Sequence, residues 1–224
     1  MAGPVAVICA MDWELAHLRN LLPDGQQIVV LAASGIGMTS AAASAQDVIV
    51  RHAPRAVLNY GCAGAHRQDL LLGDIVVGTH AIAYADPGAT ALPADPDLLD
   101  AARSVAETYQ HELWPTDLGW PLDVPHRPPR VAFGVVASAD LWNRTPATIA
   151  PLVARHHSLC EDMEAAAIAA VCARHHVPFL SLKDISNNEL LRPTTDGQSM
   201  LTELGVDQIA RRAASFTRAI LDNL

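Results

Sequence analysis

The sequence has few aromatic residues, and it lacks the patterns that mark several common classes of protein. Phe, Trp and Tyr make up 4% of the 224 residues, whereas apolar residues as a whole make up 50%. An interior filled by Ala, Val, Leu and Ile is typical of a sheet covered by helices. This apolar content excludes an intrinsically disordered chain, and the length fits one α/β domain. We therefore expect a single domain over residues 1–224.

Basic residues are in the minority, and long apolar runs are missing. The chain carries 15 Lys and Arg against 24 Asp and Glu, a formal net charge of −9. This balance argues against a nucleic-acid polymer as the main partner, but not against a small nucleoside. No apolar run approaches the ~18 residues of a membrane span. The start, Met1–Pro4, has no signal-peptide features, so we expect a cytoplasmic protein with no membrane partner.

Cysteine and histidine patterns that would indicate a metal site are also missing. The four cysteines lack CxxC spacing, so free thiols are expected at Cys9, Cys62, Cys160 and Cys172. No HExxH pattern occurs among the ten histidines, and we expect no metal and no organic cofactor. The pairs His156-His157 and His175-His176 are expected at helix C-termini, where cations are favoured.

Short apolar runs alternate with helical patterns along most of the chain. Strands are expected at Pro4–Cys9, Gln27–Ala33, Ala56–Tyr60, Asp74–Ala85, Val131–Ala137 and Pro178–Ile185. Helices are expected at Asp12–Leu22, Thr39–His52, Leu98–Tyr109, Glu164–Arg174 and Asp207–Asp222. This order predicts an α/β fold whose mixed, mostly parallel central sheet carries helices on both faces.

The stretch His111–Arg130 departs from this alternation. It contains five prolines together with Trp114 and Trp120, and we expect an irregular excursion there. Such a long loop in a compact domain is usually functional or part of an oligomer contact. The two tryptophans either complete a neighbouring subunit's site or anchor the loop to its own core.

Polar or small residues follow many of the apolar runs, and these positions predict the site. Ligands of open α/β sheets lie beyond the carboxyl ends of the strands. The candidate segments are Ala10–Glu14, Ser34–Met38, the expected turn Gly61–Ala65, Ser138–Trp142, Glu161–Glu164 and Ser186–Glu189. In Ser34–Met38, Gly35 and Gly37 either present backbone N–H groups to a ligand or form a structural turn.

Six short motifs in these segments resemble the nucleoside phosphorylase/nucleosidase superfamily, nearest to the 5′-methylthioadenosine/S-adenosylhomocysteine nucleosidases and the futalosine hydrolases. They are Ala10-Met11-Asp12-Trp13-Glu14, Ser34-Gly35-Ile36-Gly37, Gly61-Cys62-Ala63-Gly64, Leu72-Gly73-Asp74-Ile75-Val76-Val77, Asp162-Met163-Glu164-Ala165 and Ile185-Ser186-Asn187. The resemblance runs from Val5 to about Asn188 and is weakest in Pro87–Arg130. It implies cleavage of the N-glycosidic bond of a purine nucleoside.

The resemblance also implies roles for particular residues. Glu14 aligns with the glutamate that deprotonates the attacking water, although a carboxylate in a first helical turn is also favoured by the helix dipole. Met163 and Glu164 match the pair that binds the ribose, where a carboxylate would stabilise the positive charge of the transition state. The remaining expected substrate contacts are Met11 and Ile36 near the 5′ group, together with Cys62, Leu141 and Trp142.

Three residues depart from the pattern of the adenine-specific nucleosidases. Asn187 stands where those enzymes have an aspartate that protonates N7 of the base, and an amide is no general acid. Because the futalosine hydrolases and the 6-oxopurine phosphorylases have asparagine there, we expect a hypoxanthine-type base. Lys183 replaces an arginine near the water, and Cys62 replaces a serine. A nucleophilic Cys62 lacks an assignable histidine partner.

Water is expected as the nucleophile, because the arginine that holds phosphate in the hexameric phosphorylases is missing from Asn59-Tyr60-Gly61-Cys62. A phosphorylase with another phosphate site and a non-catalytic nucleoside-binding protein remain as alternatives. The resembling enzymes are homodimers, or hexamers among the phosphorylases. We therefore expect a homodimer that takes a small purine nucleoside.

Overall fold

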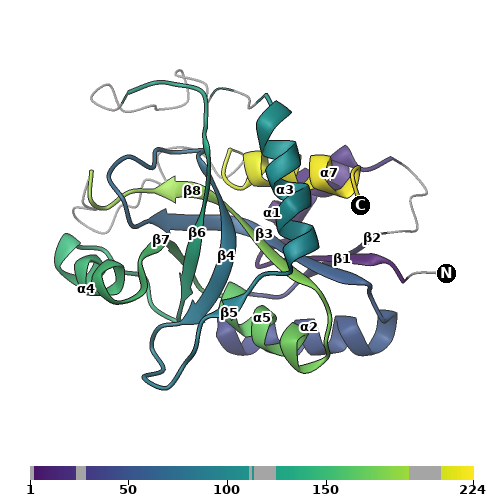
Figure 1. Cartoon of the computed structure of the whole chain (residues 1–224). Helices are drawn as coiled ribbons and strands as arrows, with labels where there is room; N and C mark the ends of the chain where they lie inside the picture. Colours follow the sequence, from purple (N-terminus) through teal and green to yellow (C-terminus); the bar gives the residue numbers. More distant parts are fainter. Residues whose placement is uncertain (1–2, 24–28, 111–112, 114–124, 192–207) are drawn as a thin grey trace.

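One mixed sheet carries the fold, with helices on both faces (Figure 1). The computed structural model describes residues 3–23, 29–110, 113, 125–191 and 208–224. Its strands are β1 (Val5–Cys9), β2 (Val29–Ala33), β3 (Ala56–Ala65), β4 (Ile75–Ala83), β5 (Leu92–Pro93), β6 (Val131–Ser138), β7 (Ser158–Asp162) and β8 (Phe179–Asn187). Its helices are α1 (Asp12–Leu21), α2 (Met38–His52), α3 (Pro96–Thr108), α4 (Pro146–His156), α5 (Ala165–Arg174) and α7 (Arg211–Leu221). The predicted fold class is confirmed.

The sheet closes partly on itself. β2, β1 and β3 are parallel neighbours, and β3 also pairs in parallel with β8. β8 then pairs with β4, β4 with β6 and β6 with β7, and β7 returns to the far end of β3. The pairs β3–β7, β4–β5 and β4–β8 are antiparallel. The ring of β3, β8, β4, β6 and β7 brings the ends of β3, β7 and β8 to one place.

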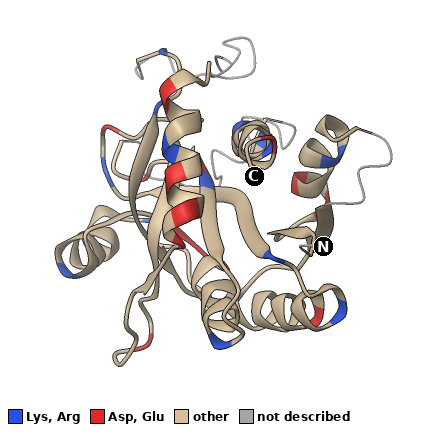
Figure 2. Cartoon of the chain, turned by 45° about the vertical axis from the view of Figure 1, so that its right-hand side comes forward, with Lys and Arg blue, Asp and Glu red and all other residues tan. Residues whose placement is uncertain are grey.

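Two apolar layers lie on opposite faces of this sheet. On one face α1, α3 and α7 pack through residues such as Leu18, Val105 and Phe216, and on the other α2 and α5 pack through Ile49 and Ile168. Acidic and basic positions are interspersed along the helices, as Figure 2 shows. None of the described helices is long and apolar enough to cross a membrane.

Three predicted details are corrected by the structure. The expected turn Gly61–Ala65 is the second half of β3, because its small residues keep hydrogen bonding to β8 and then to β7. β8 likewise continues through Asn187, which we had placed beyond the strand end. The polar sequence Ser158–Asp162 forms the buried strand β7, which apolar runs did not indicate. The predicted starts Gln27 and Asp207 lie outside the described residues.

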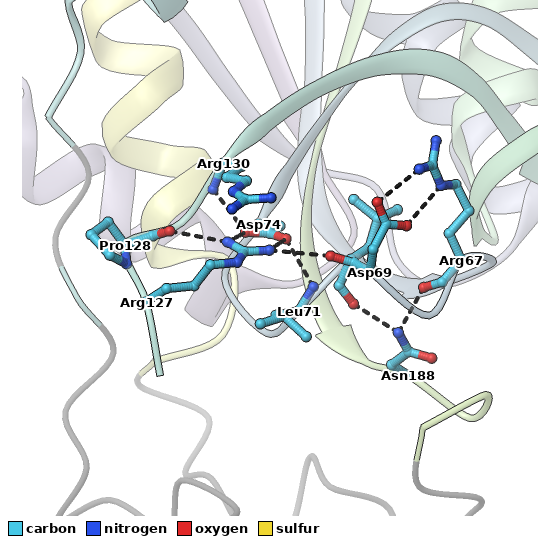
Figure 3. Close-up of polar contacts among 9 residues, drawn as sticks. Arg67, Asp69, Leu71, Asp74, Arg127, Pro128, Arg130 and Asn188 are labelled. Atoms are coloured by element: carbon cyan, nitrogen blue, oxygen red, sulfur yellow. Dashed lines mark hydrogen bonds and ion pairs between the residues drawn. The ribbon is translucent and has the colours of Figure 1, made fainter. Parts of the chain in front are cut away.

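Most of the Pro- and Trp-rich excursion, with Trp114 and Trp120, lies outside the described residues. Where the chain returns to the sheet, Asp74 holds it (Figure 3). This fully buried carboxylate accepts hydrogen bonds from the Arg127 side chain at 2.6 and 2.7 Å and from the backbone N–H of Arg130 at 2.7 Å. It also accepts one from the backbone N–H of Leu71. Asp74 therefore fixes the entry into β6.

Candidate active site

A cavity of about 330 Å³ opens at the end of the sheet where β3, β7 and β8 meet. The structure brings all ten of the predicted site residues to its wall: Met11, Glu14, Ile36, Cys62, Leu141, Trp142, Met163, Glu164, Lys183 and Asn187. They come from β3, β8, the first turn of α1 and the loops that follow β2, β6 and β7. The wall is largely apolar, with its polar groups concentrated on these strand ends. A wall of this kind, with few polar groups, is typical of a small-molecule site.

Glu14 is a buried carboxylate held by the backbone. Its Oε2 atom accepts from the N–H groups of Ala10 at 3.1 Å and Met11 at 3.0 Å. Its Oε1 atom accepts from the N–H of Cys62 at 3.1 Å. Burial raises the pKa of Glu14, while the Cys62 N–H and the Lys183 ammonium pull the pKa in the opposite direction. A fixed carboxylate of raised pKa in a cavity has the properties of a general base.

The groups next to Glu14 are poor nucleophiles. Burial and the Glu14 charge raise the pKa of the Cys62 thiol well above its ordinary value, so Cys62 stays protonated. The Tyr60 hydroxyl donates to the main-chain carbonyl of Glu14, and burial raises its pKa as well. Tyr60 therefore positions the first turn of α1 against β3.

Lys183 is fully buried and paired with an acid. Its Nζ atom lies 2.8 Å from Oδ2 of Asp162. Burial lowers the pKa of Lys183, but Asp162 and Glu164 outweigh burial and the pKa is raised overall. Lys183 is thus a fixed positive charge that faces Glu14 and Glu164 from β8.

Glu164 caps one helix while it lines the cavity. Its Oε1 atom accepts from the N–H of Gly37 at 2.9 Å, at the start of α2. The next N–H, that of Met38, donates to Asp140 at 2.7 Å. Gly37 has a φ of 97°, and a Cβ there would lie 2.8 Å from an Asp140 oxygen, so this position requires glycine. Both N–H groups therefore donate to carboxylates of the chain itself.

The acidity of Glu164 depends on its buried neighbours. Burial and the adjacent Asp162 carboxylate raise the pKa of Glu164 to about 7, although Lys183 acts in the opposite direction. Near neutral pH this group is therefore only partly ionised. Its ionised form would place a negative charge on the cavity wall.

Asn187 lies at the inner end of the cavity and is 4% exposed. Its Nδ2 atom donates to Glu189 at 3.2 Å, and its Oδ1 atom accepts from the Ser186 hydroxyl at 3.1 Å. An amide nitrogen carries two hydrogens and an amide oxygen accepts two hydrogen bonds, so each atom can make one further bond.

The mouth of the cavity is apolar. Ile36 and Leu141 are 53% and 61% exposed, an unusual state for large aliphatic residues beside a cavity. Trp142 lines the same cavity, with the Arg144 guanidinium 4.5 Å from its ring centre.

Sequence reasoning missed part of the wall. Trp13, Tyr60, Glu161 and Asp162 line the same cavity. Glu161 and Asp162 lie in the segment Glu161–Glu164, which we selected from the sequence. Adjacent residues of a strand point in opposite directions, and these two side chains have different partners: Asp162 pairs with Lys183, whereas Glu161 accepts from Asn143. The buried His66 behind Glu161 had no signal in the sequence.

Comparison with known proteins extends over the whole chain. The model of the phosphorylase superfamily matches residues 4–224. A 5′-methylthioadenosine/S-adenosylhomocysteine nucleosidase of Psychromonas ingrahamii is 30% identical, covering 98% of this chain and 99% of its own. The nucleosidase of the same name from Anoxybacillus flavithermus is 31% identical over 82% and 84%.

Solved structures show the same fold. The 5′-methylthioadenosine/S-adenosylhomocysteine nucleosidase of Neisseria meningitidis, in complex with methylthio-immucillin-A, has a TM-score of 0.78 at 25% identity, over 99% of this chain and 100% of that one. The futalosine hydrolase of Helicobacter pylori has a TM-score of 0.78 at 21% identity, over 100% and 99%, and this likeness is one of fold alone. The chain therefore belongs to the phosphorylase superfamily.

Proposed function

We propose that this protein hydrolyses the N-glycosidic bond of a 5′-modified purine nucleoside and releases the free base and a ribose derivative. The relatives named above support the reaction class. The position of Glu14 is the main support for water, rather than phosphate, as the nucleophile. Its carboxylate already accepts from the backbone N–H groups of Ala10, Met11 and Cys62, which would otherwise be anion-binding donors.

The charge of the cavity supports the same choice. Among the described residues that line it, Lys183 is the one cation, and Asp162 already pairs with it at 2.8 Å. The carboxylates of Glu14, Glu161 and Glu164 share the wall. A phosphate dianion needs charge-assisted donors and would meet repulsion here. The charges of the cavity therefore favour hydrolysis over phosphorolysis, the alternative reaction.

Each step of the proposed reaction has a candidate group in this chain. Glu14 would take a proton from the attacking water as the glycosidic bond loosens. Glu164, beside Met163, would hold the ribose hydroxyls and stabilise the cationic sugar. Asn187 would hydrogen-bond the departing base. The positive charge of Lys183 would favour the ionised form of Glu14. Ile36, Met11 and Leu141 would contact an apolar 5′ group.

We also propose that the active form is a homodimer in the cytoplasm. The exposed Ile36 and Leu141 at the mouth would be covered by a second copy. Sedimentation at micromolar concentration tests this, and a monomer with full activity would contradict it.

Base release from methylthioadenosine, adenosylhomocysteine, adenosine, inosine and futalosine in phosphate-free buffer tests the function. We expect release from at least one compound, with a loss of at least a hundredfold in Glu14→Gln. Asp12→Asn is the matched control, because Asp12 is an exposed acid in the same helical turn. Tight binding without any release would instead leave the non-catalytic alternative.

A further inference from the structure

Two polar side chains flank one glycine at the inner end of the cavity. On β3, Gly64 pairs with Glu161 of β7 on one side and with Asn187 of β8 on the other. A Cβ on Gly64 would lie 3.2 Å from Nδ2 of Asn187 and 3.6 Å from Cγ of Glu161. Both side chains line the cavity and are 4% exposed. The strand register therefore places a carboxylate and an amide side by side on the cavity wall.

Hydrogen-bond donors contact both oxygens of the Glu161 carboxylate. Its Oε1 atom accepts from the backbone N–H of Asn143 at 2.7 Å, and its Oε2 atom accepts from the Asn143 side chain at 2.5 Å. The buried His66 lies behind it, with Nε2 at 3.5 Å from Oε2, and Ser158 holds the other ring nitrogen. Each oxygen thus accepts a hydrogen bond from Asn143 and keeps a lone pair for a further donor.

An acceptor at this place distinguishes the two classes of purine. A 6-oxopurine such as hypoxanthine or guanine has an N–H donor at ring position 1, whereas adenine has a lone pair there. A buried carboxylate facing that lone pair would lose its hydration without gaining a hydrogen bond. Asn187 has one further N–H to offer and one further lone pair, so it can serve the adjacent oxygen at position 6 or N7.

We propose that Glu161 is the specificity-determining residue of this site and selects a 6-oxopurine base by accepting its N1–H. The inference rests on the proposed function for the presence of a base in the cavity. Asn187, on the other side of Gly64, would contact the same base. His66 and Asn143 are positioning residues, which fix the Glu161 carboxylate at the cavity wall.

Equilibrium binding of free hypoxanthine, guanine and adenine tests the proposal apart from catalysis. We expect the wild-type protein to bind hypoxanthine or guanine at least tenfold more tightly than adenine. In Glu161→Gln the new amide can donate to the adenine lone pair, so this preference should fall about tenfold to hundredfold, to equal binding or to a preference for adenine. Glu161→Ala should weaken 6-oxopurine binding equally without a gain for adenine.

The outcomes separate this proposal from the proposed function. Tighter binding of adenine by the wild-type protein, an unchanged preference in Glu161→Gln, or no binding of any base would overturn it. The predicted preference combined with no release of base from any nucleoside would overturn the hydrolase function instead. Equal melting temperatures for the three proteins would show that the binding changes are local.

Discussion

The carboxylate of Glu14 accepts a hydrogen bond at 3.1 Å from the backbone N–H of Cys62, although 48 residues separate the two in sequence. The other carboxylate oxygen accepts from the N–H of Met11, at the start of α1, the helix that contains Glu14. Because backbone N–H groups of β3 and of the start of α1 donate to both oxygens, the position of this acid depends on the path of β3. The first prediction follows from that dependence.

Gly61→Ala should displace Glu14. An added Cβ would lie 2.9 Å from Glu14 Oε1, closer than real Cβ contacts allow, so the carboxylate must move. Misplacement of a reacting group by about 1 Å lowers activity by about a hundredfold. Steady-state rates of base release measure the effect. Gly88→Ala is the control, because a Cβ there has an ordinary 3.5 Å contact with exposed Asp86. Equal activity of the two variants would show that Glu14 need not sit where the structure places it.

The pH dependence of kcat/KM should reveal a carboxylate with an unusually high pKa. Burial raises the pKa of Glu164 to about 7 and also raises that of Glu14. Both must be ionised in the proposed reaction, so activity should rise with pH and level off only above about 7. Rates measured from pH 5 to 9 test this. A flat profile down to pH 5 would mean that neither acid needs to lose its proton.

Much of the fold was predictable, because a run of apolar residues indicates a segment that is buried in the core. The first strand and the first two helices were predicted within about two residues of their observed bounds, since a continuous apolar run indicates a buried strand and a 3.6-residue apolar period indicates a helix. The strand β7 was not predicted, because Ser158, Glu161 and Asp162 are buried by pairing with partners distant in sequence. Such pairing leaves no local signal.

The same limit applies to the site. Resemblance located ten residues that do line one cavity, yet it did not indicate that Glu161 and Asn187 flank Gly64. That juxtaposition follows from the register of β7 and β8 on either side of β3. Register between strands far apart in sequence depends on the whole sheet.

Lys183→Met should destabilise the protein strongly. The substitution leaves the buried Asp162 carboxylate without its 2.8 Å cation, a change of about 3–5 kcal/mol in the free energy of unfolding. The double variant Lys183→Met with Asp162→Asn should recover part of this loss, because the uncompensated charge is then removed. Urea unfolding of the three proteins measures the difference. A loss below about 1 kcal/mol in the single variant would contradict a buried ion pair.

Arg127→Met and Arg67→Met should differ although both remove a two-bonded Arg–Asp pair (Figure 3). Asp74, the partner of Arg127, is fully buried, whereas the Asp69 side chain that pairs with Arg67 is 61% exposed. We expect a loss of about 3 kcal/mol for Arg127→Met and of about 1 kcal/mol or less for Arg67→Met. Thermal and urea unfolding compare the two, and equal losses would show that burial of Asp74 does not matter.

Product analysis in saturating phosphate tests the central claim most directly. The protein is incubated with a nucleoside that it cleaves, and the sugar product is identified by mass and by phosphorus NMR. Because Glu14 holds the anion-binding amides and Lys183 is paired with Asp162, we predict the free sugar alone, formed at the same rate with and without phosphate. A sugar 1-phosphate, or base release that requires phosphate, would contradict the assignment of Glu14 as the base that activates water.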